Sequence, residues 1–281
     1  MNFPAEKKTQ ARYHHILHHR SRSMTAFTFA VPIGILGGLI GLGGAEFRLP
    51  VLAGPLKYSV RQAVPLNLAV SLVTLAVALA IRGRTLSFAP LSAYAPAIAA
   101  LIAGAVITAF IGATVASRLS KQQFERVILV LLLGIGSALI IEGFLPQQLP
   151  ALLPDILGWW VIAGIFFGLA IGLVSSLLGV AGGELIIPTL VFAFGADIKT
   201  AGTASLLISL PTVMVGLLRY ANRGAFSERR PLVETVAPMG VGSAIGAIIG
   251  GLLVGITPAS LLKIGLGLIL IFSALRTFRH T

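Results

Sequence analysis

The sequence contains no cysteine and only nine acidic residues among its 281 positions. The absence of cysteine excludes disulfides, thiolate metal sites and cysteine nucleophiles. Only 11% of the residues are charged, whereas soluble globular domains carry about 25%, so the chain is not an ordinary soluble domain. All five histidines lie near the two ends, and no pairing of a nucleophile with a base is recognisable. We therefore expect no enzyme and no bound cofactor or metal.

Lys and Arg outnumber Asp and Glu by 21 to 9, which gives a net charge of +12. The basic residues stand at the ends of apolar runs and form no patch with interleaved aromatic side chains. We therefore expect no nucleic-acid partner. In a membrane protein such residues set the topology and contact lipid headgroups, so the lipid bilayer is the first partner that we expect.

Long runs without a charged residue make up most of the chain. Six of them are long enough to cross about 30 Å of hydrocarbon as a helix. They are Ser23–Ala45, Gln62–Ile81, Thr85–Ser117, Ile156–Gly183, Thr200–Leu218 and Thr235–Leu262. Two shorter runs, Val127–Ile141 and Ile264–Leu275, gain length if the flanking Arg126, Lys263 and Arg276 snorkel. Because the runs are continuous rather than alternating, we expect an all-α integral membrane protein with about eight long transmembrane helices.

One motif occurs twice, and the two copies lie 138 positions apart. GLIGLGGAEFRLP (Gly38–Pro50) is matched by SLLGVAGGELIIP (Ser176–Pro188), and the alignment extends without a gap over 37–74 and 175–212. Further on, Arg82 corresponds to Arg223. A repeat of this length indicates a duplicated unit. We predict a first repeat over 24–145, a linker over 146–157 and a second repeat over 158–278. Identical pairs include Gly41/Gly179, Gly44/Gly182, Glu46/Glu184, Pro50/Pro188, Ser71/Ser209 and Thr74/Thr212.

Two topologies fit this repeat. Four crossings per repeat give two parallel repeats, whereas five give two inverted ones, with Glu46–Ser59 and Glu184–Asp197 as short broken, re-entrant segments. The inverted 5+5 arrangement places most Lys and Arg on one side and the base-free linker on the other, as the positive-inside rule requires. We favour it, with the basic tail 1–23 and the C-terminus 279–281 cytoplasmic and the chain in the inner (plasma) membrane. The parallel 4+4 arrangement stays open at this point.

Each copy of the motif breaks an apolar run with glycines. Gly43 and Gly44, like Gly182 and Gly183, permit backbone turns that other residues disfavour. A helix that restarts at the following Glu leaves its first N–H groups unpaired, and an anion satisfies them well. Two such ends that face each other would form an anion site near the middle of the bilayer. We expect Pro50 and Pro188 in the first helical turns, where a missing N–H costs little.

Each motif also places an acid at membrane depth. Glu46 and Glu184 either cap the unpaired N–H groups themselves or bind protons, because hydrocarbon surroundings favour the neutral carboxyl. Arg48 has no basic counterpart, since Ile186 stands at that position in the second copy. It either serves as counter-ion for Glu46 or for an anionic ligand, or it snorkels to an interface. Both alternatives stay open for each residue.

Small polar residues follow each break. Asn67, Ser71 and Thr74 are spaced i, i+4 and i+7 and so share one helix face. The second copy repeats this face, with Thr203 just before it. Small hydroxyl residues also promote contacts between helices in lipid, so a ligand role and a packing role both fit. The candidate substrate site comprises Gly43, Gly44, Glu46, Arg48, Asn67, Ser71, Gly182, Gly183, Glu184, Thr203, Ser205 and Ser209.

The doubled arrangement resembles a known family. A Gly-rich break is followed by Pro50-Val51-Leu52 or Pro188-Thr189-Leu190, and then by an Ala-x-x-x-Asn/Ser-Leu helix start. This doubled pattern is similar to that of the sulfite exporter TauE/SafE family of integral membrane proteins. The resemblance implies an inner-membrane carrier of small anions such as sulfite, organosulfur compounds or other organic acids. It also implies a substrate path along the glycine breaks and the polar residues after them. Members often have an unbroken glycine run where this chain has Glu46 and Glu184.

We therefore predict a secondary transporter of a small anion that works by alternating access. Protons bound by Glu46 and Glu184 would be the coupling ion. The alternatives are a passive anion channel or a membrane scaffold that transports nothing. A homo-oligomer is compatible with either class.

Overall fold

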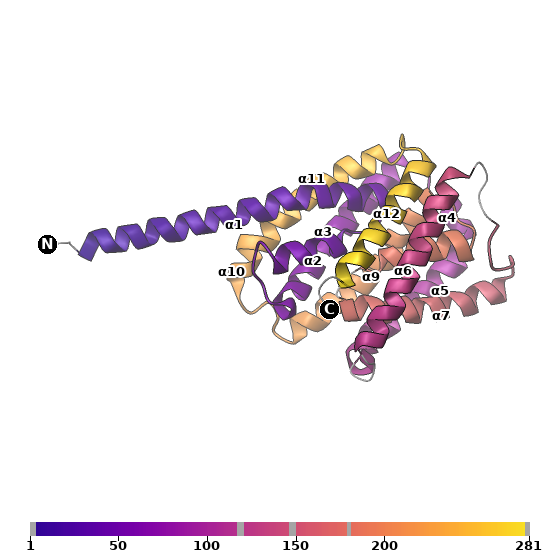
Figure 1. Cartoon of the computed structure of the whole chain (residues 1–281), viewed down its shortest axis with the longest axis horizontal. Helices are drawn as coiled ribbons and strands as arrows, with labels where there is room; N and C mark the ends of the chain where they lie inside the picture. The colour runs from indigo at the N-terminus through magenta and orange to yellow at the C-terminus, as the bar shows by residue number, and fades with distance from the viewer. Residues whose placement is uncertain (1–3, 117–120, 146–149, 179–180, 279–281) are drawn as a thin grey trace.

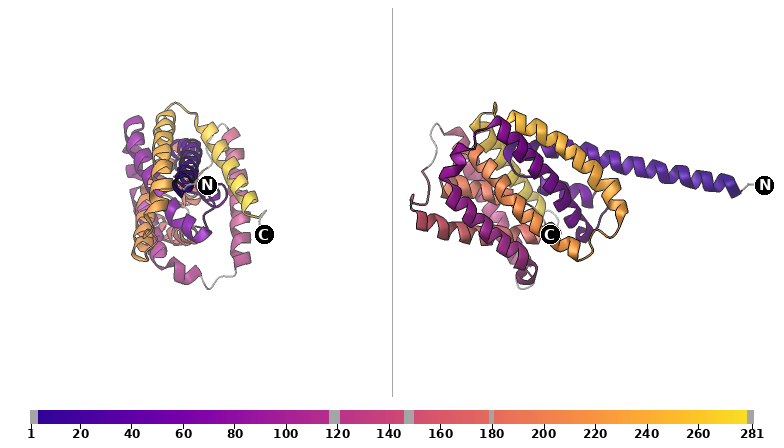
Figure 2. Two further views of the ribbon diagram at one scale, coloured as in Figure 1. Left: turned by 90° about the vertical axis from the view of Figure 1, so that its left-hand side faces the viewer. Right: turned by 180° about the vertical axis from the view of Figure 1, so that it is seen from behind.

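The structure, a computed structural model, describes residues 4–116, 121–145, 150–178 and 181–278. This part of the chain is helical and contains no strand. The long helices form a bundle, and the N-terminal part of α1 projects from it (Figures 1 and 2). They are α1 (Pro4–Ile40), α3 (Val60–Thr85), α5 (Ala95–Ala116), α6 (Lys121–Phe144), α7 (Leu157–Leu178), α9 (Ile198–Asn222), α11 (Ala237–Leu253) and α12 (Ala259–Phe278). Shorter elements are α2 (Ala45–Ala53), α4 (Ala89–Ala93), α8 (Gly183–Pro188), α10 (Arg229–Pro231) and the π-helices η1 (Thr189–Ala193) and η2 (Leu232–Val236).

Several of these helices are long and apolar enough to cross a membrane. Among the described residues they are Arg22–Ile40, Arg61–Thr85, Leu157–Ser175, Ile198–Asn222 and Arg229–Leu253. Shorter apolar helices cover Ala95–Phe110, Leu133–Phe144, Gly183–Ala193 and Ala259–Phe272. The all-helical membrane class is thus confirmed, while the number of eight crossings stays a prediction.

Two predicted runs divide differently in the structure. The run Thr85–Ser117 contains a short separate helix, α4, before α5 begins. The run Thr235–Leu262 is not one helix either, because α11 ends at Leu253 and α12 already begins at Ala259. Lys263 therefore lies inside a helix and is 5% exposed, and its Nζ donates to Oε1 of buried Glu142 on α6 at 2.8 Å. The prediction that Lys263 snorkels is wrong, because an acid inside the bundle compensates its charge.

The helices after the two breaks begin in the same way. Ser59 caps α3 in a capping box with Gln62, and Asp197 caps α9 by accepting the N–H groups of Lys199 and Thr200 at 3.0 and 3.1 Å. Ser59 and Asp197 are 138 positions apart, like the motif itself. Polar caps at equivalent positions fix where both helices start.

The long helices pack in pairs that each join the two predicted repeats. These pairs are α1 with α11, α5 with α7, α3 with α9, and α6 with α12. Glycines make the contacts close. A methyl group added to Gly34 would lie within 3.0 Å of Ser243 backbone atoms, and one on Gly38 would lie 3.0 Å from the Cα of Ala247. Since both residue numbers rise together, α1 and α11 run parallel.

Two pairs of helices at corresponding positions of the predicted repeats run in opposite directions. On α6, Gly136 lies beside Gly267 of α12, whereas Gly143, further along α6, lies beside the earlier Ser260 and Ile264 of α12. The pair α6 and α12 is therefore antiparallel.

The same holds for α3 and α9. Arg82, near the end of α3, reaches Lys199 at the start of α9. Leu68, near the start of α3, lies beside Gly216 in the last third of α9. The pair α3 and α9 is therefore antiparallel as well.

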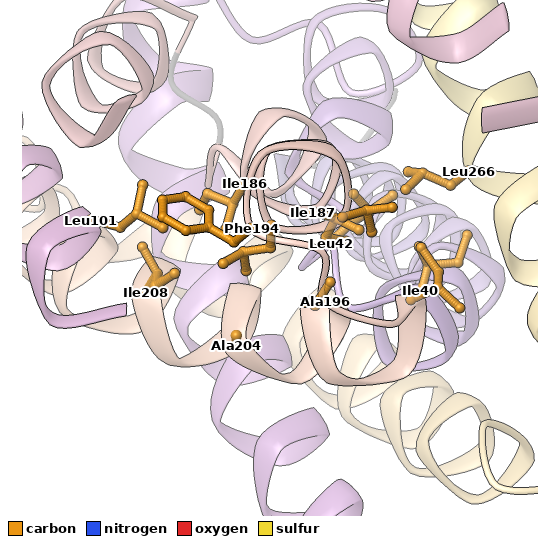
Figure 3. Close-up of a cluster of buried hydrophobic side chains, with 14 of the residues drawn as sticks. Ile40, Leu42, Leu101, Ile186, Ile187, Phe194, Ala196, Ala204, Ile208 and Leu266 are labelled. Atoms are coloured by element: carbon orange, nitrogen blue, oxygen red, sulfur yellow. The ribbon is translucent and has the colours of Figure 1, made fainter. Parts of the chain in front are cut away.

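The largest apolar cluster surrounds the second break. Ile40 and Leu42, from the end of α1 and the first break, belong to the same cluster as Ile186 and Ile187 of α8, and Figure 3 shows Leu42 beside Ile187. Phe194, after η1, belongs to the same cluster. Both breaks are thus embedded in the interior of the bundle.

Candidate functional site

The two predicted breaks are present in the structure. Helix α1 ends at Ile40 and α2 begins at Ala45, while α7 is followed after a short gap by α8. Gly44 and Gly182 cap α2 and α8 with φ of 73° and 78°, in the left-handed region that favours glycine. Gly179, the predicted counterpart of Gly41, lies outside the described residues.

The breaks contact each other inside the bundle. A Cβ atom on Gly43 would lie 3.6 Å from the Cβ of Ala181, and one on Gly183 would lie 3.0 Å from the carbonyl oxygen of Leu42. Gly43, Gly183 and both capping glycines are buried. The structure thus brings the four predicted site glycines together, and their role in substrate binding stays a prediction.

The two prolines lie deeper in their helices than we predicted. Pro50 stands more than one turn after the start of α2, and Pro188 is the last residue of α8. The prediction that they occupy first turns is wrong. A proline inside a helix removes one backbone hydrogen bond and crowds the preceding turn. After Pro188 the backbone indeed continues as the π-helix η1.

Arg48 is the centre of a buried polar cluster. Its side chain is completely buried, so the snorkelling alternative is wrong. A guanidinium has five N–H donors, and five hydrogen bonds account for them. Nε donates to Asn67 Oδ1 at 3.2 Å, Nη1 to Thr74 Oγ1 at 2.7 Å and Ser243 Oγ at 3.2 Å, and Nη2 to Ser71 Oγ at 2.9 Å and to the Gly43 carbonyl.

These five acceptors are all neutral oxygens. Asn67, Ser71 and Thr74 come from α3, as their shared face predicted, whereas Ser243 comes from α11 in the second repeat. Arg48 thus connects the two halves of the chain. These acceptors carry no charge and so do not neutralise the guanidinium, on which Glu46 acts through space.

The two predicted acids lie in the same region. Glu184 is 6% exposed. The carboxyl group of Glu46 interacts electrostatically with Glu184 and Arg48, and it lies against the Glu46 backbone N–H. Its Oε1 is buried without a hydrogen-bond partner. Glu46 therefore caps its own helix in part, and one of its oxygens remains available.

The polar face of α9 is arranged differently from that of α3. Ser209 Oγ donates directly to the carbonyl of Ala181 at 2.9 Å. Ser205 is completely buried, and its Oγ has no hydrogen-bond partner. Ile186, at the position equivalent to Arg48, is 1% exposed and belongs to the apolar cluster.

Thr203 binds a second buried arginine rather than Arg48. Its Oγ1 accepts from Nη1 of Arg82 at 3.0 Å. Arg82 is completely buried at the end of α3, and it donates to the carbonyls of Gly38 at 3.0 Å and Leu39 at 2.8 Å. These carbonyls belong to the last turn of α1, where a cation is favourable. Thr203 is thus part of an arginine cluster at one end of the bundle.

Sequence reasoning missed Ser243 and Arg82 as members of buried clusters. Ser243 lies in a Gly-rich apolar helix, and its counterpart in the aligned repeat is Leu101, so the repeat gave no signal. Arg82 stands at the end of an apolar run, where a basic residue indicates a membrane boundary rather than a buried cluster. It lies eight positions after Thr74 on α3, so extending the polar stripe of Asn67, Ser71 and Thr74 would have found it.

Two cavities have lining residues outside the predicted site, and the second borders the end of α8 at Pro188. One of about 580 Å³ is lined by Phe110, Val215, Leu218, Arg219, Asn222 and Arg223. The other, of about 480 Å³, lies between α6, α7 and η1 and is almost entirely apolar. None of the predicted site residues lines either cavity.

Comparison with known proteins identifies the family. A family model described as "Sulfite exporter TauE/SafE" matches residues 3–139 and 164–281. The unmatched stretch 140–163 contains the predicted linker. No curated protein and no solved structure matches the chain. The family comprises membrane transporters rather than enzymes, and membership implies transport of a small anion. With a match over nearly its whole length, this chain belongs to the sulfite exporter TauE/SafE family of membrane transporters.

Proposed function

We propose that the protein is a secondary carrier of a small anion, such as sulfite, an organosulfonate or a related organic acid, and that it works by alternating access of two inverted repeats. The observation that carries the proposal is the position of Arg48. Its completely buried guanidinium lies where the two glycine breaks meet, and neutral oxygens from both halves hold it.

The cluster around Arg48 has the chemistry that an oxoanion needs. Guanidinium groups bind carboxylates and similar planar or tetrahedral anions through parallel N–H donors. Hydroxyl groups donate as well as accept, so Ser71, Thr74 and Ser243 can turn from Arg48 to an arriving anion. The first N–H groups of α2 add further donors. In this scheme the neutral acceptors hold Arg48 between transport cycles.

The directions of the helices support inverted repeats. Parallel repeats would make corresponding helices cross the membrane in the same sense. Instead, α3 runs antiparallel to α9, and α6 runs antiparallel to α12. With the positive-inside rule, this arrangement supports a 5+5 topology with α2 and α8–η1 as re-entrant segments and both termini on the cytoplasmic side of the plasma membrane.

The unequal ends of the bundle support alternating access. Arg82 ties the end of α1 to the start of α9, since it donates to Leu39 and also to the Lys199 carbonyl at 3.3 Å. Its counterpart Arg223 is exposed beside the 580 Å³ cavity. Inverted repeats that adopt unequal conformations close one side and open the other. In the opposite state we expect Arg82 to be released.

The two acids supply the coupling. Transport of an anion past Glu46 and Glu184 requires that positive charge reach this region, because uncompensated charge in an apolar interior is costly. A proton on one carboxyl group is the smallest such charge. The pair therefore couples the movement of the anion to the binding of a proton.

Reconstituted vesicles test the carrier proposal. Uptake should be measured for an anion chosen by a thermal-shift screen of sulfite, sulfate, thiosulfate, sulfonates and short carboxylates. We expect Arg48→Gln to lower the initial rate by at least about tenfold, since a hydrogen bond to a charged group contributes about 1.5–3 kcal/mol. Exposed Arg84→Gln is the matched control and should transport normally. Single-channel conductance would instead identify a channel, and absence of flux a scaffold.

A second measurement tests the coupling role of the acids. Uptake by the unmodified protein should change across pH 5–8, whereas Glu46→Gln and Glu184→Gln should lose this dependence while still being expressed. Glu228→Gln, at an exposed position, is the control. A pH profile that survives in both site variants would remove the acids from the coupling mechanism.

A further inference from the structure

The helix pair α3–α11 is closely packed where α3 ends. A Cβ atom on Gly251 of α11 would lie 2.8 Å from Ile81 Cγ2, near the end of α3. The hydroxyl of Thr85, the last residue of α3, donates to the Gly251 carbonyl at 3.0 Å. Side chains therefore fill the space between these two helices up to the end of α3.

The equivalent pair in the second half, α9 with α5, is open at the same place. Ala109 of α5 corresponds to Gly251 in the alignment that pairs Leu101 with Ser243. Its carbonyl accepts a hydrogen bond from Nη1 of Arg219 on α9 at 3.2 Å. The cavity of about 580 Å³ described above is lined by Arg219 and by Phe110, the residue after Ala109. Sites for small molecules usually have volumes of about 300–1,000 Å³, so this cavity is large enough for a ligand.

The lining of the cavity combines two cations with an apolar wall. Arg219, Asn222 and Arg223 come from the end of α9, and no acidic residue is among the lining residues. Arg219 uses one of its donors for the Ala109 carbonyl. Within the described part of the chain, the Arg223 side chain takes part in no hydrogen bond or ion pair. Most N–H donors of the two guanidinium groups are thus available, and such groups bind phosphate through parallel N–H donors.

The cavity lies at the end of a membrane span. The stretch Ile198–Asn222 of α9 is long and apolar enough to cross a membrane, so its last residues reach the depth of the lipid headgroups. Basic residues at this depth often only snorkel. Arg219 differs, because its bond to Ala109 places the guanidinium between α9 and α5. Phe110 and Leu218, which also line the cavity, are more than half exposed, so the apolar wall is open to lipid.

We propose that the cavity between α5 and α9 binds one anionic phospholipid, with Arg219 and Arg223 donating to its phosphate and with an acyl chain against Phe110 and Leu218. Basic pockets between membrane helices bind such headgroups. The apolar wall favours a lipid over a soluble anion, and the two uncompensated cations favour a headgroup with net negative charge over a zwitterionic one. The proposal does not depend on the proposed function, because none of the four residues binds the transported anion at Arg48.

Lipid binding can be measured on the purified protein without any transport assay. Delipidated protein in detergent should receive equal amounts of phosphatidylglycerol and phosphatidylcholine with identical acyl chains, and native mass spectrometry should count the lipids retained. We expect one phosphatidylglycerol per chain, bound at least about tenfold more tightly than phosphatidylcholine. Arg219→Gln combined with Arg223→Gln should remove this preference. Arg61→Gln combined with Arg229→Gln changes the net charge equally at exposed positions outside the cavity, and it should keep the preference.

A second variant tests the cavity itself with both arginines retained. Val215→Trp fills the cavity from its wall and should abolish lipid retention, whereas Met214→Trp, at the exposed neighbouring position, should not. The proposal is wrong if the two lipids are retained equally, or if the double arginine variant and Val215→Trp both keep phosphatidylglycerol. It is also wrong if inorganic phosphate at the same concentration displaces the lipid, since the cavity would then hold a soluble anion.

Discussion

The two halves of the chain share a backbone break but fill it with different chemistry. Around the first break, Arg48 binds hydroxyl groups and a carbonyl in a polar cluster. Around the second, Ile186 lies in an apolar cluster, and the Ser209 hydroxyl donates a hydrogen bond to the carbonyl of Ala181. The glycine caps are the same in both. The two copies of the motif thus have the same backbone geometry and different side chains, which indicates that the break itself is what both halves need.

The largest effect should come from removing the breaks. Gly44→Leu and Gly182→Leu both place a side chain at positive φ, which costs about 1–2 kcal/mol. A Cβ on Gly44 would lie 2.7 Å from Ile33 Cγ2, whereas one on Gly182 would meet its nearest atom, on Ile171, only at 3.1 Å. We expect both variants to lose the anion-induced thermal shift, and Gly44→Leu to melt at the lower temperature.

Gly158→Leu is the control for the glycine variants, because no atom lies within 4 Å of the position that its Cβ would occupy. It should bind and melt like the unmodified protein. Full anion binding by either break variant would place the site elsewhere. Equal melting temperatures for the two would mean that the first break is no more tightly packed than the second.

A smaller effect should separate the two equivalent arginines at the ends of the bundle. Arg82→Met removes charge-assisted bonds to Gly38 and Leu39 and should lower the free energy of unfolding by about 1.5–3 kcal/mol. Arg223→Met changes an exposed side chain and should stay within about 0.5 kcal/mol. Thermal unfolding in detergent measures both. Equal losses would show that the two ends are equally closed, which the proposed alternating access does not allow.

The smallest perturbation tests the topology. Because the chain has no cysteine, single cysteines can be labelled without background. Asp155→Cys in the linker and Ser227→Cys between α9 and α10 are exposed, and neither should alter stability. A membrane-impermeant maleimide should reach them from opposite sides of the membrane if the repeats are inverted. Labelling of both from the same side would instead support the parallel 4+4 arrangement.

The helical membrane class and the two breaks could be predicted from the sequence. Long uncharged runs form membrane helices and clustered glycines interrupt them, and both effects depend only on neighbouring residues. The cap positions Ser59 and Asp197 follow the same logic. Arg48 could be singled out because it stands at membrane depth without a counterpart in the repeat. Its binding partners on α3 were also predictable, since helical spacing places Asn67, Ser71 and Thr74 on one face.

The remaining features depend on which helices pack together, and a single sequence does not contain this information. Ser243 binds Arg48 only because α11 lies beside α1 and α3. Lys263 is buried only because α6 brings Glu142 to it. Arg82 looks like a loop charge until the end of α1 is placed beside it. In each case a side chain that is costly to bury was placed by a partner distant in the sequence.

The pairing of α1 with α11 also constrains how the protein is made. Gly34 and Gly38 on α1 pack against Ser243 and Ala247. These partners are synthesised roughly 200 residues later. Until then Arg48 lacks one of its acceptors and the glycine face of α1 is open to lipid or to the insertion machinery. Neither half synthesised alone can complete its own packing, so correct assembly in the membrane is an event of the finished chain.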